Sequence, residues 1–120
     1  MIGAFINTSA VSEWLAAQRK NVVVLCSGWK NRFCLEDALF AGHSRDDCWT
    51  PACSDPIAIP PTLRWTWEPA ESDVLDYVEK AAQRHRLKRL GLDDVIPYSF
   101  ACDLVDIVPV FDGHAIRAFV

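Results

Sequence analysis

Residues able to bind a phosphate group follow the first long apolar run of the chain. Ser27 and Gly28 come directly after Val22–Cys26, and Lys30 lies two residues further on. Glycine allows close backbone approach to an anion and lysine supplies positive charge, so the pattern is compatible with a phosphate-binding loop. An ordinary strand-to-helix connection is the alternative, and neither a Walker motif nor a dinucleotide-binding motif is present to decide between them.

Two adjacent carboxylates, Glu36 and Asp37, open the next apolar segment. Carboxylate oxygens are the hard ligands that Mg²⁺ requires, but acidic residues are also favoured in the first turn of a helix. Asn7, which follows the short apolar run Ile2–Phe5, also has two possible roles. It could help to bind an anion at a helix N-terminus, or it could simply cap the helix that follows.

Other polar groups give weaker indications. Cys34, His43, Cys48 and Cys53 are of the types that bind zinc, although the pair Cys48-x₄-Cys53 is wider than the usual C-x₂-C. The basic stretch 84–89 could contact a phosphate or a sulfonate, or it could complement the dipole at a helix C-terminus. Within it, His85 falls on an apolar stripe and is expected in the core.

The first 42 residues alternate between strand and helix patterns. We expect strands at Ile2–Phe5 and at Val22–Cys26, the second buried on both faces because its apolar run does not alternate. Helices are expected at Ala10–Gln18 and at Leu35–Ala41, the latter ended by Gly42. This alternation predicts an α/β fold with a partial two- or three-layer parallel sheet and flanking helices.

The rest of the chain begins with an irregular segment over 43–69 that is rich in proline and tryptophan. We expect its tryptophan side chains to pack against the fold and hold the segment in place. A helix is predicted over Ser72–Leu90. Asp112-Gly113 is a two-residue hairpin signal. Strands are expected at 96–101, 107–111 and 114–119.

Composition limits the class of protein. With 120 residues and 51% hydrophobic residues, the chain should form a single domain over 1–120. Such a domain should expose roughly 6,500 Å². A net charge of −4 argues against nucleic-acid binding. No apolar run is long enough to span a membrane, and the N-terminus lacks signal-peptide features. Together with an odd count of five cysteines, this predicts a cytoplasmic location.

Five segments resemble, in the correct order, blocks of the 2-phosphosulfolactate phosphatase family of coenzyme M biosynthesis. These segments are Gly3–Val11, Val23–Gly28, Phe33–Gly42, His85–Val95 and Val108–Val110. The resemblance implies an α/β, Mg²⁺-dependent acid phosphatase that releases 3-sulfolactate from a small phosphorylated sulfonate. It also implies that Glu36 and Asp37 lie at the metal and phosphate site as catalytic groups and metal ligands.

The same resemblance implies that Asn7, Ser27, Gly28 and Lys30 contribute to substrate binding. The chain corresponds to the C-terminal half of that family, and Trp29 stands where the family usually has threonine. Removing half of an α/β domain should uncover a sheet edge, so we expect pairing with a second copy or with a complementary N-terminal half. The alternative to an enzyme is a non-catalytic interaction module that pairs through exposed apolar surface.

Overall fold

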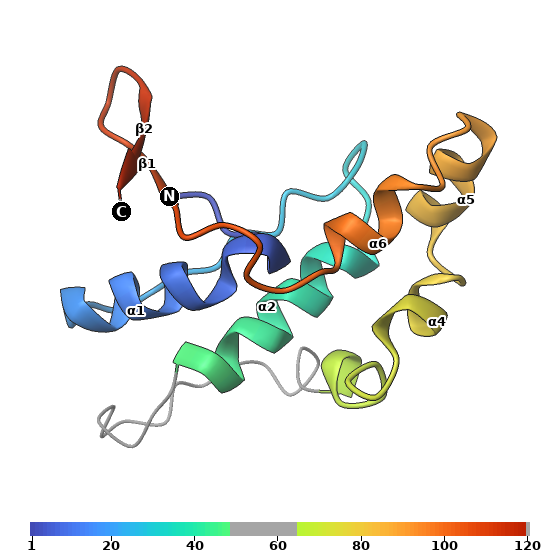
Figure 1. Ribbon diagram of the computed structural model, residues 1–120, viewed down its shortest axis with the longest axis horizontal. Helices are drawn as coiled ribbons and strands as arrows, with labels where there is room; N and C mark the ends of the chain where they lie inside the picture. Colours follow the sequence, from blue (N-terminus) through green and yellow to red (C-terminus); the bar gives the residue numbers. More distant parts are fainter. Residues whose placement is uncertain (49–64, 120) are drawn as a thin grey trace.

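The computed structural model describes residues 1–48 and 65–119, without the side chains of residues 44–48. Helices dominate, with a short hairpin at the C-terminal end (Figure 1). Residues 65–67 add a helical turn. The elements are η1 (Phe5–Asn7), α1 (Thr8–Gln18), α2 (Leu35–Cys48), α4 (Val74–Val78), α5 (Ala82–Arg89), α6 (Val95–Ser99), β1 (Val108–Phe111) and β2 (Ile116–Phe119).

Helix α2 runs through the middle of the molecule, and α1 packs along it (Figure 1). The expected helix 35–41 is therefore confirmed at its start, but the expected stop at Gly42 is wrong because α2 continues to Cys48. Ala38, Ala41 and Gly42 are all buried and share one face of the helix. This packing offsets the cost of a glycine inside a helix, about 1 kcal/mol relative to alanine.

Neither of the two strands predicted in the first 26 residues forms. Ile2 donates a backbone hydrogen bond to Pro109, and the chain then turns into η1. The run Val22–Cys26 has no regular structure, and the side chains of Val23 and Leu25 are each 90% exposed. A strand needs a neighbour for its backbone groups, and no strand in the described residues lies beside this run. The described part of the chain therefore holds helices and a two-stranded antiparallel sheet, with no parallel sheet.

The predicted helix over 72–90 is divided into α4 and α5. Ala81 lies between them in an extended conformation, with φ −72° and ψ 139°. Asp73 caps α4 by accepting a hydrogen bond from the Asp76 amide at 3.0 Å. The break leaves His85 exposed instead of in the core.

The strand predicted over 96–101 is also wrong, because residues 95–99 form helix α6. Pro97 occupies the first turn of that helix, where an amide donor has no intrahelical partner and its loss costs little. Ile96 is buried in the core, and Phe100, just after the helix, packs against it.

The C-terminal hairpin is confirmed. β1 pairs with β2 in antiparallel register from Val108↔Phe119 to Phe111↔Ile116. Its loop contains four residues, 112–115, rather than two, because the Asp112 carboxylate accepts hydrogen bonds from the His114 and Ala115 amides. The hairpin projects from the helical body (Figure 1).

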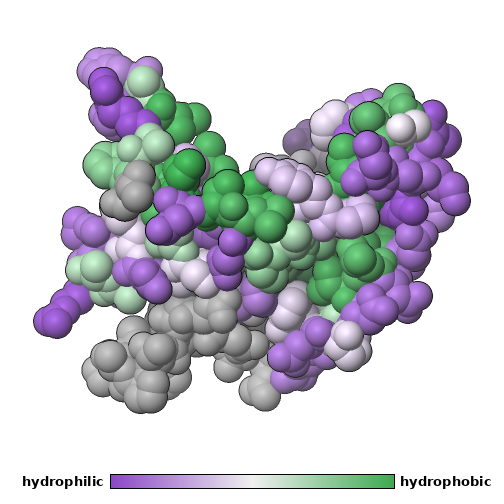
Figure 2. Space-filling model, viewed as in Figure 1, coloured by the Kyte–Doolittle hydropathy of each residue, from purple (hydrophilic) through white to green (hydrophobic). Residues whose placement is uncertain are grey.

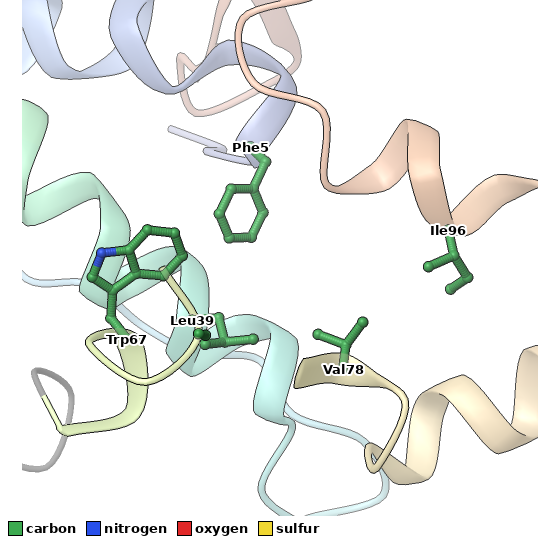
Figure 3. Close-up of a cluster of buried hydrophobic side chains, with 6 residues drawn as sticks. Phe5, Leu39, Trp67, Val78 and Ile96 are labelled. Atoms are coloured by element: carbon green, nitrogen blue, oxygen red, sulfur yellow. The ribbon is translucent and has the colours of Figure 1, made fainter. Parts of the chain in front are cut away.

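The core joins elements that are distant in sequence. Its buried cluster consists of Phe5, Leu39, Trp67, Ala70, Val78 and Ile96. Figure 3 shows five of these side chains pointing toward a shared interior from η1, α2, α4, α6 and the helical turn at Trp67. Docking by tryptophan is confirmed at Trp67, which is 8% exposed, but not at Trp65, which is 67% exposed. Trp49 lies outside the described residues.

Candidate active site

The loop after Val22–Cys26 contains a tight turn. Trp29 and Arg32 exchange backbone hydrogen bonds of 3.1 and 3.0 Å. The two residues between them, Lys30 and Asn31, adopt φ values of 49° and 58°. Positive φ at both central positions is the geometry of a type I′ turn. The turn reverses the chain and returns it toward the start of α2.

Gly28 connects this turn to the acidic pair. Its φ is 65°, and a Cβ atom at this position would lie 2.5 Å from the Arg32 carbonyl oxygen. Its amide donates a hydrogen bond of 2.6 Å to Oδ2 of Asp37 in the first turn of α2. The loop and the carboxylate therefore hold each other in place.

The acidic pair lines a cavity of about 580 Å³. Ser27, Glu36 and Asp37 contribute its polar groups from the loop and from α2. The rest of the wall comes from the N-terminal segment, from α1 and α2, from Val22–Cys26, and from residues of the α4–α6 region that include Arg84. In Figure 2, hydrophobic surface gathers in the hollow between the hairpin and α5. The cavity thus combines an apolar wall with two carboxylates and one guanidinium group.

Three residues predicted for substrate binding, Asn7, Gly28 and Lys30, do not line this cavity, and Gly28 reaches it only through its hydrogen bond to Asp37. Asn7 is 5% exposed, and its amide group binds the backbone: Oδ1 accepts from Ala4 at 2.8 Å and Nδ2 donates to Ile107 at 2.9 Å. Asn7 therefore joins the N-terminal segment to the chain before β1. Lys30 is exposed at the tip of the turn, with Nζ 6.0 Å from the centre of the Trp29 ring.

Arg84, from the basic stretch 84–89 for which the sequence left two roles open, lines the cavity. Its side chain is only 13% exposed and forms ion pairs with Glu79, at 2.7 Å, and with Asp93. The hydrogen bonds to these carboxylates, first to Asp93 and then to Glu79, raise its pKa. Helical spacing gives no signal for this placement, because the break at Ala81 sets the direction of α5.

The surroundings of the acidic pair favour the protonated form of two nearby thiols. Burial and the negative charge of Asp37 raise the pKa of Cys26, which also lines the cavity. Burial, Glu36 and Asp37 raise the pKa of Cys34. A raised pKa lowers the thiolate fraction of these two cysteines at neutral pH.

Glu36 and Asp37 carry the type of ligand that Mg²⁺ prefers. Mg²⁺ is commonly held by one or two carboxylates, with water and substrate phosphate oxygens completing its octahedron. Asp37 uses Oδ2 to accept from Gly28 and has Oδ1 as a second oxygen. Within the described residues, no group of three or more His, Cys, Asp or Glu side chains forms a metal site. The zinc hypothesis needs Cys53, outside the described residues, and the side chain of Cys48, which is not described.

Comparisons with known proteins identify the family. The sequence model for 2-phosphosulpholactate phosphatase matches residues 1–114. A probable 2-phosphosulfolactate phosphatase of Gloeobacter violaceus is 33% identical over 110 residues, which cover 91% of this chain and 45% of the relative. One of Caldanaerobacter subterraneus is 24% identical over 117 residues, covering 98% of this chain and 48% of the relative.

The chain belongs to the 2-phosphosulfolactate phosphatase family, because the family match covers nearly all of its residues. It spans about half the length of the curated relatives that it matches. In the part of the chain that the structure describes, no helix is long and apolar enough to cross a membrane.

Proposed function

We propose that this chain supplies the metal- and phosphate-binding part of a 2-phosphosulfolactate phosphatase. Water would cleave the phosphate ester to give 3-sulfolactate and phosphate, in the cytoplasm and as a step of coenzyme M biosynthesis. The supporting observation is that Glu36 and Asp37 line one cavity together, with Asp37 held by the Gly28 amide. Family membership supports the choice of substrate class.

The residues in and beside the cavity have distinct roles in this proposal. Glu36 and Asp37 would hold Mg²⁺, which supplies charge neutralisation at the phosphoryl oxygens when bound. Gly28 orients Asp37 through its 2.6 Å hydrogen bond. Ser27 offers a hydroxyl group to the substrate from the same loop. Arg84 would favour the phosphate or sulfonate, because a guanidinium group matches the geometry of such oxyanions.

Phosphate release from 2-phosphosulfolactate tests this function. The chain would be assayed with and without Mg²⁺, alone and mixed with the part of the Gloeobacter violaceus relative that it does not match. We expect Mg²⁺-dependent release, and a loss of about 100-fold or more in Asp37→Asn, which keeps an oxygen acceptor for Gly28 but removes the charge.

Glu13→Gln, on the exposed side of α1, is the matched control and should leave the rate unchanged. Calorimetric titration with Mg²⁺ alone gives a second readout, in which Asp37→Asn should weaken binding. Absence of release in every mixture, or an unaltered rate in Asp37→Asn, would contradict the proposal.

The exposed run Val22–Cys26 favours a second function, that of a subunit completed by a partner. Val23 and Leu25 are each 90% exposed, and Val24 is 50% exposed. We propose that this run pairs with a strand in the remaining part of the family domain, because the curated relatives are about twice as long.

Mixing the chain with the unmatched part of the Gloeobacter violaceus relative tests the pairing by light scattering. We expect a one-to-one complex, and loss of that complex in the double variant Val23→Thr/Leu25→Thr, which keeps β propensity and removes apolar surface. If the chain stays a monomer in the mixture, the subunit function is wrong. If the chain forms only a homodimer, its partner is a second copy of the chain, and the proposed pairing with the unmatched part of the family domain is wrong.

A further inference from the structure

A cysteine and a histidine that are distant in sequence meet at a second cavity. Sγ of Cys102, in the segment between α6 and β1, lies 3.6 Å from Nε2 of His43 on α2. This distance is within hydrogen-bonding range for sulfur. The two residues are 59 positions apart, so the tertiary fold alone brings them together.

Aromatic rings fix the position of the imidazole. The His43 ring stacks on Phe5 at a centroid distance of 5.2 Å and an interplanar angle of 23°. It also contacts the Trp67 ring at 4.6 Å. Phe5 and Trp67 are both buried in the core. His43 is therefore held by rigid neighbours and presents Nε2 to the thiol without further ordering.

The pair opens onto its own cavity of about 370 Å³. His43 and Cys102 line it together with Trp67, Glu71, Val74 and Phe100. Cys102 is exposed, so a reagent can reach its sulfur. Glu71 places a carboxylate in the same cavity. Ser27, Glu36 and Asp37 line the other cavity.

A thiol beside an imidazole can pass its proton to the ring, and the resulting thiolate is the nucleophilic form of cysteine. We propose that Cys102 and His43 form a thiol-modification site that accepts small-molecule disulfides. The Cys102 thiolate attacks one sulfur of the disulfide, a new S–S bond forms, and the original S–S bond breaks. The departing thiolate takes the proton from the His43 imidazolium, so one disulfide and one thiol are exchanged with no net oxidation.

Two other cysteines provide an internal comparison. Cys26 is exposed like Cys102. Partial desolvation of its thiol, followed by the negative charge of Asp37, raises its pKa. Cys34 is partly buried, and its pKa is raised by burial and by Glu36. Neither has an imidazole hydrogen bond among the described contacts. Exposure alone would give Cys26 and Cys102 similar rates, whereas the His43 contact predicts a faster Cys102.

The experiment follows mixed-disulfide formation with bis(2-hydroxyethyl) disulfide at neutral pH, resolved by cysteine through peptide mass spectrometry. We expect Cys102 to react about tenfold faster than Cys26, since an ordinary thiol is only a few per cent ionised at neutral pH. His43→Phe should reduce the Cys102 rate to near that of Cys26, because phenylalanine keeps the ring contacts and lacks the ring nitrogens. The Cys26 rate in the same sample should not change.

Equal rates for Cys102 and Cys26 in the unaltered protein would overturn the proposal, and this comparison needs no variant. An unaltered Cys102 rate in a folded His43→Phe protein would also overturn it, with folding checked by near-ultraviolet circular dichroism. Because the readout is adduct formation rather than phosphate release, its failure is distinct from failure of the phosphatase proposal.

Discussion

Two features of Gly28 disfavour any other residue at this position: its positive φ and the lack of space for a side chain. Its φ of 65° is unfavourable for other residues, and a Cβ atom would also lie 2.5 Å from the Arg32 carbonyl oxygen. Gly91 has a similar φ of 70° but no atom within 4 Å of a Cβ position. Comparing alanine substitutions at these two glycines therefore distinguishes the cost of backbone strain from the cost of steric crowding.

We expect Gly28→Ala to reduce the free energy of unfolding by about 2–4 kcal/mol, or to displace the loop that holds Asp37. Gly91→Ala should cost only about 1 kcal/mol, since it meets the strain alone. Urea unfolding of both variants measures the difference. Equal losses would show that the loop around Gly28 moves away without cost and does not hold Asp37 firmly.

At the scale of elements, the hairpin turn depends on one carboxylate. Asp112 Oδ1 accepts from the His114 and Ala115 amides, and Oδ2 accepts from Nε of Arg117 at 2.5 Å. The Ala115 amide, followed by Arg117 and the His114 amide, lowers the pKa of Asp112 below its ordinary value. A lowered pKa means that the folded hairpin favours the ionised form.

The hairpin should therefore keep this stabilisation above the unfolded-state pKa of about 4, and lose it as pH falls through the lower folded-state pKa. Amide hydrogen exchange at Ala115, followed between about pH 2 and pH 6 and corrected for intrinsic rates, measures the effect. Asp112→Asn should remove the pH dependence in this range. If protection at Ala115 in the unaltered protein does not change with pH, the carboxylate does not hold the turn.

At the scale of the whole molecule, the apolar residues divide between a buried cluster and an exposed run. Leu39 is fully buried, while Val23 and Leu25 are 90% exposed. Val23→Thr/Leu25→Thr should therefore change the stability of the isolated chain by only about 0.5 kcal/mol, whereas Leu39→Ala should cost about 2–5 kcal/mol. Urea unfolding compares them. A large loss in the double variant would mean that the run already packs within this chain, which would remove the argument for a partner.

Sequence patterns predicted the elements that depend on nearby residues. The start of α2 at Leu35 follows the apolar pattern and the acidic first turn, and the hairpin β1–β2 follows Asp112-Gly113 between two apolar runs. The patterns failed where distant contacts compete with local preference. The sequence around Ile96 predicted a strand, but Ile96 packs into the core from helix α6. The pattern over 72–90 predicted one continuous helix, but the extended conformation of Ala81 interrupts it.

The candidate site divides in the same way. Ser27, Glu36 and Asp37 were predicted for the site from the family resemblance, since residue type alone left their roles open, and they line one cavity. The link from Gly28 to Asp37 is local, because the two residues are nine positions apart. Arg84 could not be predicted for that cavity because its placement depends on the direction of α5 after Ala81. The contact of His43 with Cys102 was also invisible, since neither residue has a local motif.

The sequence by itself determined the family, the acidic pair Glu36 and Asp37, the glycine at position 28 and the C-terminal hairpin. These features depend on residue identity and short spacing. Only the tertiary structure decided that Val22–Cys26 stays exposed, that Asn7 serves the backbone and that Arg84 reaches the cavity. Strand pairing, burial and helix direction depend on which distant surfaces are present to pack against, and short-range patterns carry little information about those surfaces.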